Sequence, residues 1–304
     1  MKTKNSPVSY LSWLEKHTSS LEGKTVAVTG STGGLGRELC RYLLYLGARL
    51  ILVDRNSARA ETLRRELTAE MPTAEISLIT ADLSDMDAVR TATEQLSGEP
   101  LDVFIHNAGA YSIPRKICTT GYDNVFQINF ISPYYMIRKL MPTLAERQGR
   151  VVVVGSIAHN YGKADPKSID FADRTRASKV YGNAKRYLMF SLYELFKDRT
   201  DVTLSVTHPG ITFTGITAHY PKVIFAIIKH PMKVIFMKPK KAALSILRGI
   251  FEGCETCEWI GPRFFDVWGL PRKKLLKTCG EEERRFIGQA AEEIFGKIST
   301  EKLA

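Results

Sequence analysis

The sequence of 304 residues has few cysteines and no long hydrophobic run. Five cysteines, an odd number, argue against a disulfide framework. Cys254 and Cys257 form a CxxC pair without the further ligands that zinc requires, so no metal site is expected, and a redox pair is the alternative. No stretch reaches the ~18 apolar residues of a membrane span, and residues 1–17 lack the apolar core of a secretory signal. We therefore expect a reducing, cytoplasmic setting.

The composition is that of a globular, basic protein. Hydrophobic residues make up 44% and charged residues 25% of the chain, which argues against disorder and fibrous repeats. Lysine and arginine total 43 against 32 acidic residues, giving a net charge of +11. That excess favours anionic partners such as nucleotides or a membrane surface. The charge is dispersed and no recognition motif accompanies it, so we expect no nucleic-acid partner.

Short apolar runs alternate with helical stretches from residue 24 onward. The runs are β-branched and of strand length, at 25–29, 49–53, 75–80, 101–106, 150–154 and 201–207. Their near-continuous apolarity suits strands that are covered on both faces. The stretches 37–46, 57–70 and 85–96 have helical spacing. This alternation predicts the α/β class with a single doubly wound parallel sheet of Rossmann type, and we expect one domain over residues 1–304.

Two regions lie outside the alternation. Residues 1–22 form an N-terminal extension in which we expect a short amphipathic helix. Residues 215–240 are apolar, aromatic and basic, and three prolines interrupt them. An insertion at this point, after the sixth strand, would lie over the carboxyl ends of the strands, where ligands bind in this architecture. We therefore expect residues 215–240 to form an apolar lid over a ligand site.

A glycine-rich turn connects the first strand to the first helix. Glycine permits positive φ and lets the backbone approach a pyrophosphate closely. The N-terminus of the helix then offers free N–H groups and a partial positive charge to the phosphates. Residues 29–36, TGSTGGLG, thus predict a nucleotide site formed by Gly30, Ser31, Thr32, Gly33, Gly34, Leu35 and Gly36. A turn that needs glycine for structural reasons alone is the alternative.

Asp54 and Arg55 come at the end of the second strand, where a dinucleotide places its adenosine ribose. A carboxylate there would accept hydrogen bonds from both ribose hydroxyls and repel a 2′-phosphate. Arg55 would instead bind that phosphate. Because Asp54 comes first and the glycine turn has no basic residue, the sequence favours NAD over NADP as the cofactor.

With these features the chain resembles the short-chain dehydrogenase/reductase family. TGxxxGxG is the cofactor motif of that family, and residues 106–109 resemble its NNAG motif with His106 in place of the first asparagine. The resemblance is strong over residues 22–215, and the tail, residues 258–304, resembles the branch of retinol dehydrogenases and WW-domain oxidoreductases. It implies a catalytic tetrad of Asn129, Ser156, Tyr181 and Lys185. It also implies cofactor contacts from Asp82, Leu83, Asn107, Ala108, Gly109, Tyr181, Lys185, Pro209, Gly210, Ile211 and Thr214.

A tyrosine and a lysine four residues apart share one face of a helix. An ammonium about 4 Å from a phenol favours the phenolate by roughly 4 kcal/mol at an effective dielectric of ~20, or about three pKa units. The pKa of the tyrosine would then approach neutrality, where proton exchange with a carbonyl oxygen is efficient. Tyr181 lies early in the helix after the fifth strand, nearest the site, and is the predicted catalytic tyrosine. The same spacing occurs in Tyr135/Lys139 and Tyr193/Lys197.

The other tetrad members take the roles that the resemblance implies. Ser156 ends the fifth strand, and its hydroxyl can donate a hydrogen bond to a substrate carbonyl. Asn129 would hold a water in a proton relay to Lys185, and an amide that satisfies a kinked helix backbone is the alternative. His159, three residues after Ser156, is expected to be a solvated loop residue, and a place in the lining of the pocket is the alternative.

The predicted lid points to an apolar substrate, a ketone, aldehyde or alcohol of retinoid, steroid or lipid type. Interleaved lysines such as Lys222 and Lys229 would also suit peripheral contact with an anionic membrane surface, and plain helix packing is the alternative. The resemblance further implies a homo-oligomer. We therefore expect an NAD(P)-dependent oxidoreductase that transfers a hydride to or from a carbonyl or alcohol carbon. A non-catalytic NAD(P)-sensing protein on the same fold is the alternative.

Overall fold

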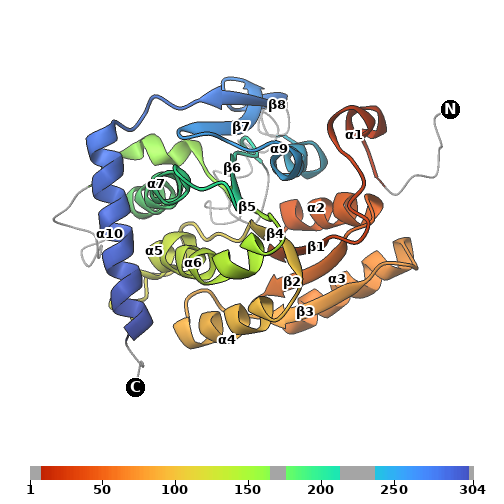
Figure 1. Cartoon of the computed structure of the whole chain (residues 1–304), viewed down its shortest axis with the longest axis horizontal. Coiled ribbons are helices and arrows are strands. Elements are labelled where there is room, and N and C mark those ends of the chain that lie inside the picture. Colours follow the sequence, from red (N-terminus) through yellow and green to blue (C-terminus); the bar gives the residue numbers. More distant parts are fainter. Residues whose placement is uncertain (1–7, 165–175, 213–236, 301–304) are drawn as a thin grey trace, which may run out of the picture.

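A computed structural model describes residues 8–164, 176–212 and 237–300. Eight strands form one sheet in the order β3-β2-β1-β4-β5-β6-β7-β8 (Figure 1). Neighbouring strands are parallel from β3 through to β7, whereas β7 and β8 are antiparallel. The strands are β1 (Thr25–Thr29), β2 (Arg49–Asp54), β3 (Ile76–Thr80), β4 (Leu101–His106), β5 (Arg150–Val154), β6 (Thr203–Thr207), β7 (Glu258–Phe264) and β8 (Trp268–Leu275).

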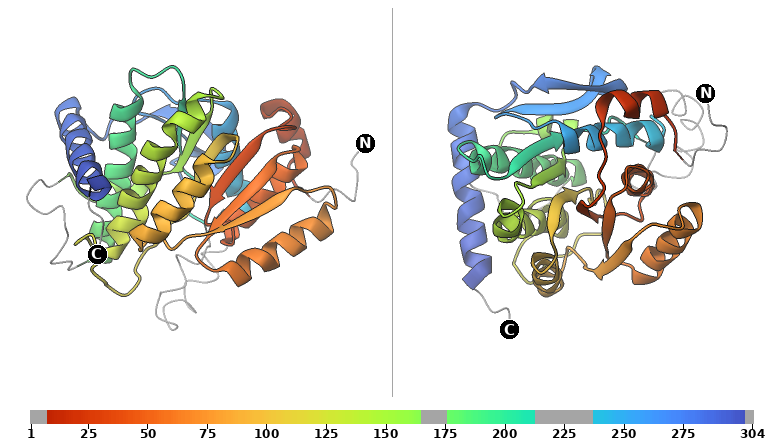
Figure 2. Two further views of the ribbon diagram at one scale, coloured as in Figure 1. Left: turned by 60° about the horizontal axis from the view of Figure 1, so that its bottom comes forward. Right: turned by 45° about the vertical axis from the view of Figure 1, so that its right-hand side comes forward.

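Helices cover both faces of the sheet (Figure 2). One face packs against α1 (Leu11–His17), α2 (Gly34–Tyr45), α3 (Ser57–Glu70) and α9 (Pro239–Phe251). The other face packs against α4 (Met86–Ser97), α5 (Asn124–Phe126), the π-helix η1 (Gln127–Ile131), α6 (Ser132–Ala145) and α7 (Ala177–Phe196), with α10 (Glu281–Thr300) lying along α7. A 3₁₀ turn, η2 (Ile157–Tyr161), follows β5. Within the described ranges, no helix is long and apolar enough to cross a membrane.

The central strands are apolar throughout because each of their faces is buried. In β1, Val26 and Val28 belong to the core under α2 and α9, whereas Ala27 belongs to the core under α4 and α6. Successive side chains of a strand point to opposite faces of the sheet, so a sheet covered on both sides buries every position. The predicted α/β class with a doubly wound sheet is confirmed.

The strand bounds agree with the prediction to within two residues. The structure adds two strands that the sequence analysis does not contain, β7 and β8, which lie within the tail, residues 258–304. Pro262 and Pro271 lie opposite one another in this pair, and prolines in a run of residues argue against a strand. The predicted N-terminal helix corresponds to α1, where Trp13 and Leu14 are buried.

Most of the predicted lid falls outside the described residues, which resume at Met237. Met237 is buried in the core under α2 and α9. Pro239 begins α9, which packs against α2 and the sheet. The last residues of the segment predicted as a lid, from Met237 onward, belong to the layer that covers the sheet, and the lid stays a prediction for residues 215–236.

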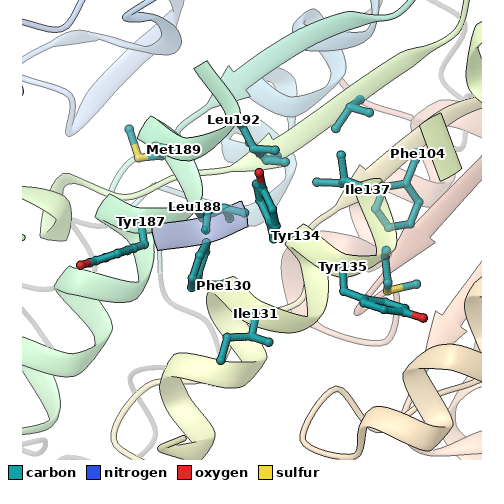
Figure 3. Packing of buried hydrophobic residues seen from close by; sticks show 14 of the residues in the cluster. Phe104, Phe130, Ile131, Tyr134, Tyr135, Ile137, Tyr187, Leu188, Met189 and Leu192 are labelled. Atoms are coloured by element: carbon teal, nitrogen blue, oxygen red, sulfur yellow. The ribbon is translucent and has the colours of Figure 1, made fainter. Parts of the chain in front are cut away.

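Aromatic side chains fill the space between η1, α6 and α7. The ring of Tyr187 lies 5.4 Å from that of Phe130 and 5.5 Å from that of Phe126, measured between centroids. Figure 3 shows Phe130 and Tyr134 on one side of this contact and Tyr187 and Leu188 on the other. Rings at such distances contribute attraction beyond the area they bury. This contact holds α7, the helix of Tyr181 and Lys185, at a set position over the sheet.

A buried ion pair joins α10 to α7. Arg186 is 2% exposed, and its Nε and Nη2 atoms donate to the two carboxylate oxygens of Glu283 at 2.7 and 2.6 Å. Further along α10, Phe295 packs against Tyr135, and Glu292 accepts a hydrogen bond from Arg138 at 3.0 Å. The C-terminal helix is thus tied to both helices that flank β5.

Replacing Glu283 should destabilise the fold strongly. Glu283→Ala leaves a buried guanidinium without its counter-charge, and we expect the free energy of unfolding to fall by about 3–5 kcal/mol. Glu281→Ala is the matched control two residues earlier in the same helix, because the Glu281 side chain is 71% exposed and exposed ion pairs contribute below ~1 kcal/mol. Chemical denaturation measures the unfolding free energy of both variants. Equal decreases in the two variants would contradict a structural role for the Arg186–Glu283 ion pair.

Candidate active site

A cavity of about 720 Å³ lies at the carboxyl ends of β1, β4, β5 and β6. The strand order reverses between β1 and β4, and ligands bind in such crevices of doubly wound sheets. Most of the residues predicted from the sequence line it. They are Gly30, Thr32, Gly33, Gly34, Leu35, Gly36, Asp54, Arg55, Asp82, Leu83, Asn107, Ala108, Gly109, Ser156, Tyr181, Lys185, Pro209, Gly210 and Ile211. Ser31 and Asn129 are fully buried behind the wall, and Thr214 lies outside the described residues.

The glycine turn needs its glycines for close packing. Gly30 has a φ of +67°, and a Cβ atom there would lie 2.8 Å from Cα of Ala108. A Cβ atom on Gly36 would overlap the carbonyl oxygen of Gly30. The side-chain amide of Asn107 donates to the carbonyl oxygens of Thr29 and Gly30 at 3.1 and 2.9 Å, which fixes the turn against β4.

The same turn leaves room for a diphosphate at the start of α2. Among the described residues, a Cβ atom on Gly34 would meet no atom closer than 4.0 Å, so these residues leave space beside the backbone there. The capping residue Gly33 has no side chain to accept from the first N–H groups, and the first turn has no acidic residue. These amides line the cavity and carry the positive end of the helix dipole. The residues therefore fit the pyrophosphate of a dinucleotide.

Asp54 is engaged by the glycine turn. Its Oδ1 accepts from the backbone N–H and the hydroxyl of Thr32 at 3.2 and 2.8 Å, and its Oδ2 accepts from the N–H of Ser31 at 3.1 Å and from the hydroxyl of that residue. Four donors fill the acceptor capacity of a carboxylate. Asp54 is only 5% exposed, whereas Arg55 and Arg59 are exposed and line the cavity.

Tyr181, Ser156 and Lys185 meet at the other end of the cavity. Tyr181 and Lys185 lie in α7, and a hydrogen bond joins the side chains of Tyr181 and Ser156. The ammonium of Lys185 lies 5.8 Å from the centre of the Tyr181 ring and donates to the carbonyl oxygen of Val154 at 2.8 Å. Hydroxyl, phenol and ammonium groups thus converge beyond the glycine turn.

Burial governs the ionisation of this group of side chains. It raises the pKa of Tyr181 to about 12, and the hydrogen bond from Ser156 opposes this rise. Burial also lowers the pKa of Lys185 to about 7. The pKa of Tyr181 is therefore not near neutrality as the helical spacing suggested, because lost solvation outweighs a lysine that is directed at a backbone carbonyl.

Asn129 lies in the π-helix η1 and satisfies backbone groups. Its Nδ2 donates to the carbonyl oxygens of Val125 and Ala110, each at 2.8 Å, and its Oδ1 accepts from the N–H of Ala110 at 3.4 Å. A Cβ atom on Gly109 would lie 2.9 Å from that Oδ1 and 3.8 Å from Nζ of Lys185. Asn129 therefore lies close to Lys185 while it holds the 109–111 loop to its helix.

His106, which replaces the first asparagine of the NNAG motif, is fully buried at the end of β4. The hydroxyl of Thr29 accepts from the backbone N–H groups of Asn107 and Ala108, so it donates its own proton to Nδ1 of His106 at 3.1 Å. Burial lowers the pKa of His106 well below its ordinary value. The histidine therefore supports the turn as a neutral ring.

The other two tyrosine–lysine pairs lie away from the cavity. Tyr135 packs against Phe295 of α10, and the hydroxyl of Tyr193 donates to the carbonyl oxygen of Glu258. The expectation of a solvated His159 is wrong, because this residue is 1% exposed. The sequence analysis missed several lining residues, namely Asn56, Arg59, Tyr111, Ile113, Ile157, Tyr161 and His208. They follow the ends of strands, which is the one sequence signal that marks them.

The chain belongs to the short-chain dehydrogenase/reductase family. The family pattern described as short chain dehydrogenase matches residues 24–222. Retinol dehydrogenase 14 of Homo sapiens is 32% identical over 217 residues, covering 66% of this chain and 65% of the relative. Dehydrogenase/reductase SDR family member 13 of Homo sapiens is 34% identical over 254 residues, covering 81% of this chain and 66% of the relative. The predicted family and its retinol dehydrogenase branch are confirmed. Each of these two matches covers just under two thirds of the length of the relative.

Solved structures share the fold. An uncharacterised protein from Mycobacterium paratuberculosis superposes with a TM-score of 0.71 at 22% identity, covering 94% of this chain and 97% of that chain. RhlG of Pseudomonas aeruginosa, solved as a complex with NADP, gives a TM-score of 0.59 at 22% identity, covering 77% and 91% of the two chains.

Replacing Lys185 should change how stability depends on pH. Below pH 7 the lysine is charged in the folded and the unfolded chain, and its burial is unfavourable. Between its folded pKa of about 7 and its ordinary value of 10.5, the folded protein loses a proton that the unfolded chain keeps, so stability rises with pH. Relative to Lys185→Met, the wild-type unfolding free energy should rise by about 3 kcal/mol between pH 6 and pH 9. If the unfolding free energies of the wild type and of Lys185→Met changed equally between pH 6 and pH 9, the lowered pKa of Lys185 would be contradicted.

Proposed function

We propose that this protein transfers a hydride between NADP and the carbonyl or alcohol carbon of an apolar substrate. The observation that carries the proposal is one cavity in which a diphosphate cradle at α2 and the Tyr181–Ser156 hydrogen bond lie at opposite ends. The nicotinamide of the cofactor supplies the hydride chemistry, and the protein supplies alignment and proton transfer. Membership in a family of dehydrogenases supports the same conclusion.

Tyr181 is the proposed proton donor. With its pKa near 12 it is a neutral phenol at neutral pH, and a phenol can protonate the stronger base that forms when a carbonyl is reduced. Ser156 donates to the same substrate oxygen and stabilises the charge that develops there. Lys185 is proposed to bind the nicotinamide ribose, and Asn129 to hold a water that connects Lys185 with solvent.

Cofactor choice follows from the state of Asp54. The sequence favours NAD because a free carboxylate would accept from the ribose hydroxyls, but the four donors of the glycine turn occupy both oxygens of Asp54. The exposed guanidinium groups that line this end of the cavity belong to Arg55 and Arg59. Guanidinium binds phosphate through paired, charge-assisted hydrogen bonds. We therefore propose NADP in place of NAD.

Arg55→Ala should discriminate between the two cofactors. Loss of a charge-assisted phosphate contact should raise KM for NADPH by about 10–100-fold, while KM for NADH stays within about 3-fold. Arg65→Ala is the matched control, because Arg65 lies in the following helix α3 with its side chain 76% exposed and is not among the residues that line the cavity. Steady-state kinetics with both cofactors give the result. Equal changes for NADPH and NADH would reject the 2′-phosphate contact.

The substrate is proposed to be an apolar ketone, aldehyde or alcohol. Beyond Tyr181 the cavity is lined by Tyr111, Ile113, Ile157 and Tyr161, and the ring of Tyr111 meets that of Tyr181 edge-on at 5.2 Å. Such a wall binds apolar and aromatic groups. The names of the retinol dehydrogenase relatives support a substrate of this class.

Tyr181→Phe tests whether the protein is an enzyme or a cofactor sensor. Removal of this hydroxyl should lower kcat for reduction of apolar carbonyls by about 10²–10⁴-fold, with NADPH affinity unchanged. Tyr135→Phe, at the same spacing from its own lysine but outside the cavity, should keep wild-type turnover. Absorbance at 340 nm follows the reaction, and fluorescence titration measures binding. Unchanged turnover in Tyr181→Phe, or none in the wild type, would refute the proposal.

Three wider expectations are also retained as proposals. We propose a single domain over residues 1–304, because β7, β8 and α10 pack into the same cores as the preceding elements. We propose a homo-oligomer as well. An assembly through the helices that flank β5 would have to include α10, since α10 packs against both α6 and α7. Membrane contact through residues 215–240 stays a proposal, since residues 215–236 lie outside the described ranges.

A further inference from the structure

His159 links Ser156 to the C-terminal segment of the chain. Its Nδ1 lies 2.6 Å from the carbonyl oxygen of Ser156, which also accepts from the backbone N–H of His159 at 3.1 Å. Its Nε2 lies 2.8 Å from the hydroxyl oxygen of Thr278. The ring packs edge-on against Phe190 at 5.8 Å and Trp259 at 5.6 Å. A fully enclosed imidazole therefore joins two segments that are about 120 residues apart in the sequence.

The partners of the ring determine its tautomer. A carbonyl oxygen only accepts hydrogen bonds, so Nδ1 must carry a proton toward Ser156. Burial disfavours the imidazolium form of His159, so Nε2 is unprotonated and accepts from the hydroxyl of Thr278. Two donors then hold the Ser156 carbonyl, and the peptide group after Ser156 cannot rotate without losing both. This keeps the Ser156 hydroxyl directed at the phenol of Tyr181.

Arg186 holds the other end of the same turn. Its Nη1 donates to the carbonyl oxygen of His159 at 3.0 Å, and its Nη2 donates to the carbonyl oxygen of Thr278 at 2.7 Å. Glu283 pairs with this guanidinium and also accepts from the backbone N–H of Ala164 at 2.8 Å. The turn after β5 is thus held at residues 159 and 164 by groups from α7 and from residues 278–283, and His159 in turn holds the carbonyl oxygen of Ser156.

We propose that His159 and Thr278 are positioning residues for Ser156, so that the C-terminal segment completes the active site. The inference rests on the proposed reductase function and extends it to residues that do not touch the reacting atoms. His159 acts through the Ser156 carbonyl, and Thr278 acts through the tautomer and orientation of His159. Their effect on turnover should therefore exist only while Ser156 is present.

A double-mutant cycle with Ser156→Ala tests this dependence. His159→Phe keeps the ring and its packing but removes both nitrogen atoms, and it should lower kcat for carbonyl reduction by about 10–100-fold with NADPH affinity unchanged. In the Ser156→Ala background the same substitution should change kcat by less than about 2-fold, because coupled residues are not additive. His159→Asn, whose amide can replace the Nδ1 donor, should recover most of the loss.

Thr278→Val should act in the same direction as His159→Phe but more weakly, and Thr278→Ser should behave as the wild type. Thr300→Val is the matched control, because among the described residues the Thr300 hydroxyl donates to carbonyl oxygens of its own helix alone. Equal effects of His159→Phe with and without Ser156, or no effect at all, would overturn the positioning role. A wild type without turnover, by contrast, would refute the reductase function itself.

The tautomer gives a readout that does not need turnover. Nitrogen-15 spectra of the full chain, assigned with His159→Asn, should show a neutral His159 that carries its proton on Nδ1. Free histidine prefers the proton on Nε2, so the buried ring should be distinguishable. A proton on Nε2 would remove the donor to Ser156 and overturn the proposal, whatever the kinetics show.

Discussion

The crevice depends on the hydrogen bonds that hold the glycine turn against the ends of β2 and β4. Asp54 binds the turn from one side through Ser31 and Thr32, and Asn107 binds it from the other through two carbonyl oxygens. Buried polar groups are stable only when each has a partner. The side chains of Asp54 and Asn107 provide these partners for the glycine turn. The first N–H groups of α2 take no part in these bonds and face the cavity.

The first six strands and the place of the crevice could be predicted because their signals are local. A strand such as β5, with four valines in a row, is apolar because both faces of the sheet are covered. The glycine turn and the residues at strand ends follow from the same topology, since parallel strands bring their carboxyl ends to one edge. The position of Tyr181, early in the helix after the fifth strand, then indicated which of the three tyrosine–lysine pairs lies at that edge, in agreement with the family resemblance.

The remainder could not be predicted because it depends on contacts between distant segments. The surroundings of His159 are set by Thr278 and Trp259, which no local pattern connects to it. The engagement of Asp54 by Ser31 and Thr32 is equally invisible in the sequence, although the proposal of NADP in place of NAD rests on it. The strands β7 and β8 carry prolines and basic residues, and only their pairing beside β6 makes them strands.

The link between the Ser156 turn and residues 278–283 imposes an order on biosynthesis. A ribosome makes the chain from its N-terminus, so the sheet from β1 to β6 and the helix of Tyr181 emerge well before Glu283. Until then the guanidinium of Arg186 lacks its carboxylate and the ring of His159 lacks the Thr278 hydroxyl. The nascent protein can therefore form the proposed nucleotide cradle before the proposed catalytic serine is fixed in place, and the proposed site is complete only with the final helix.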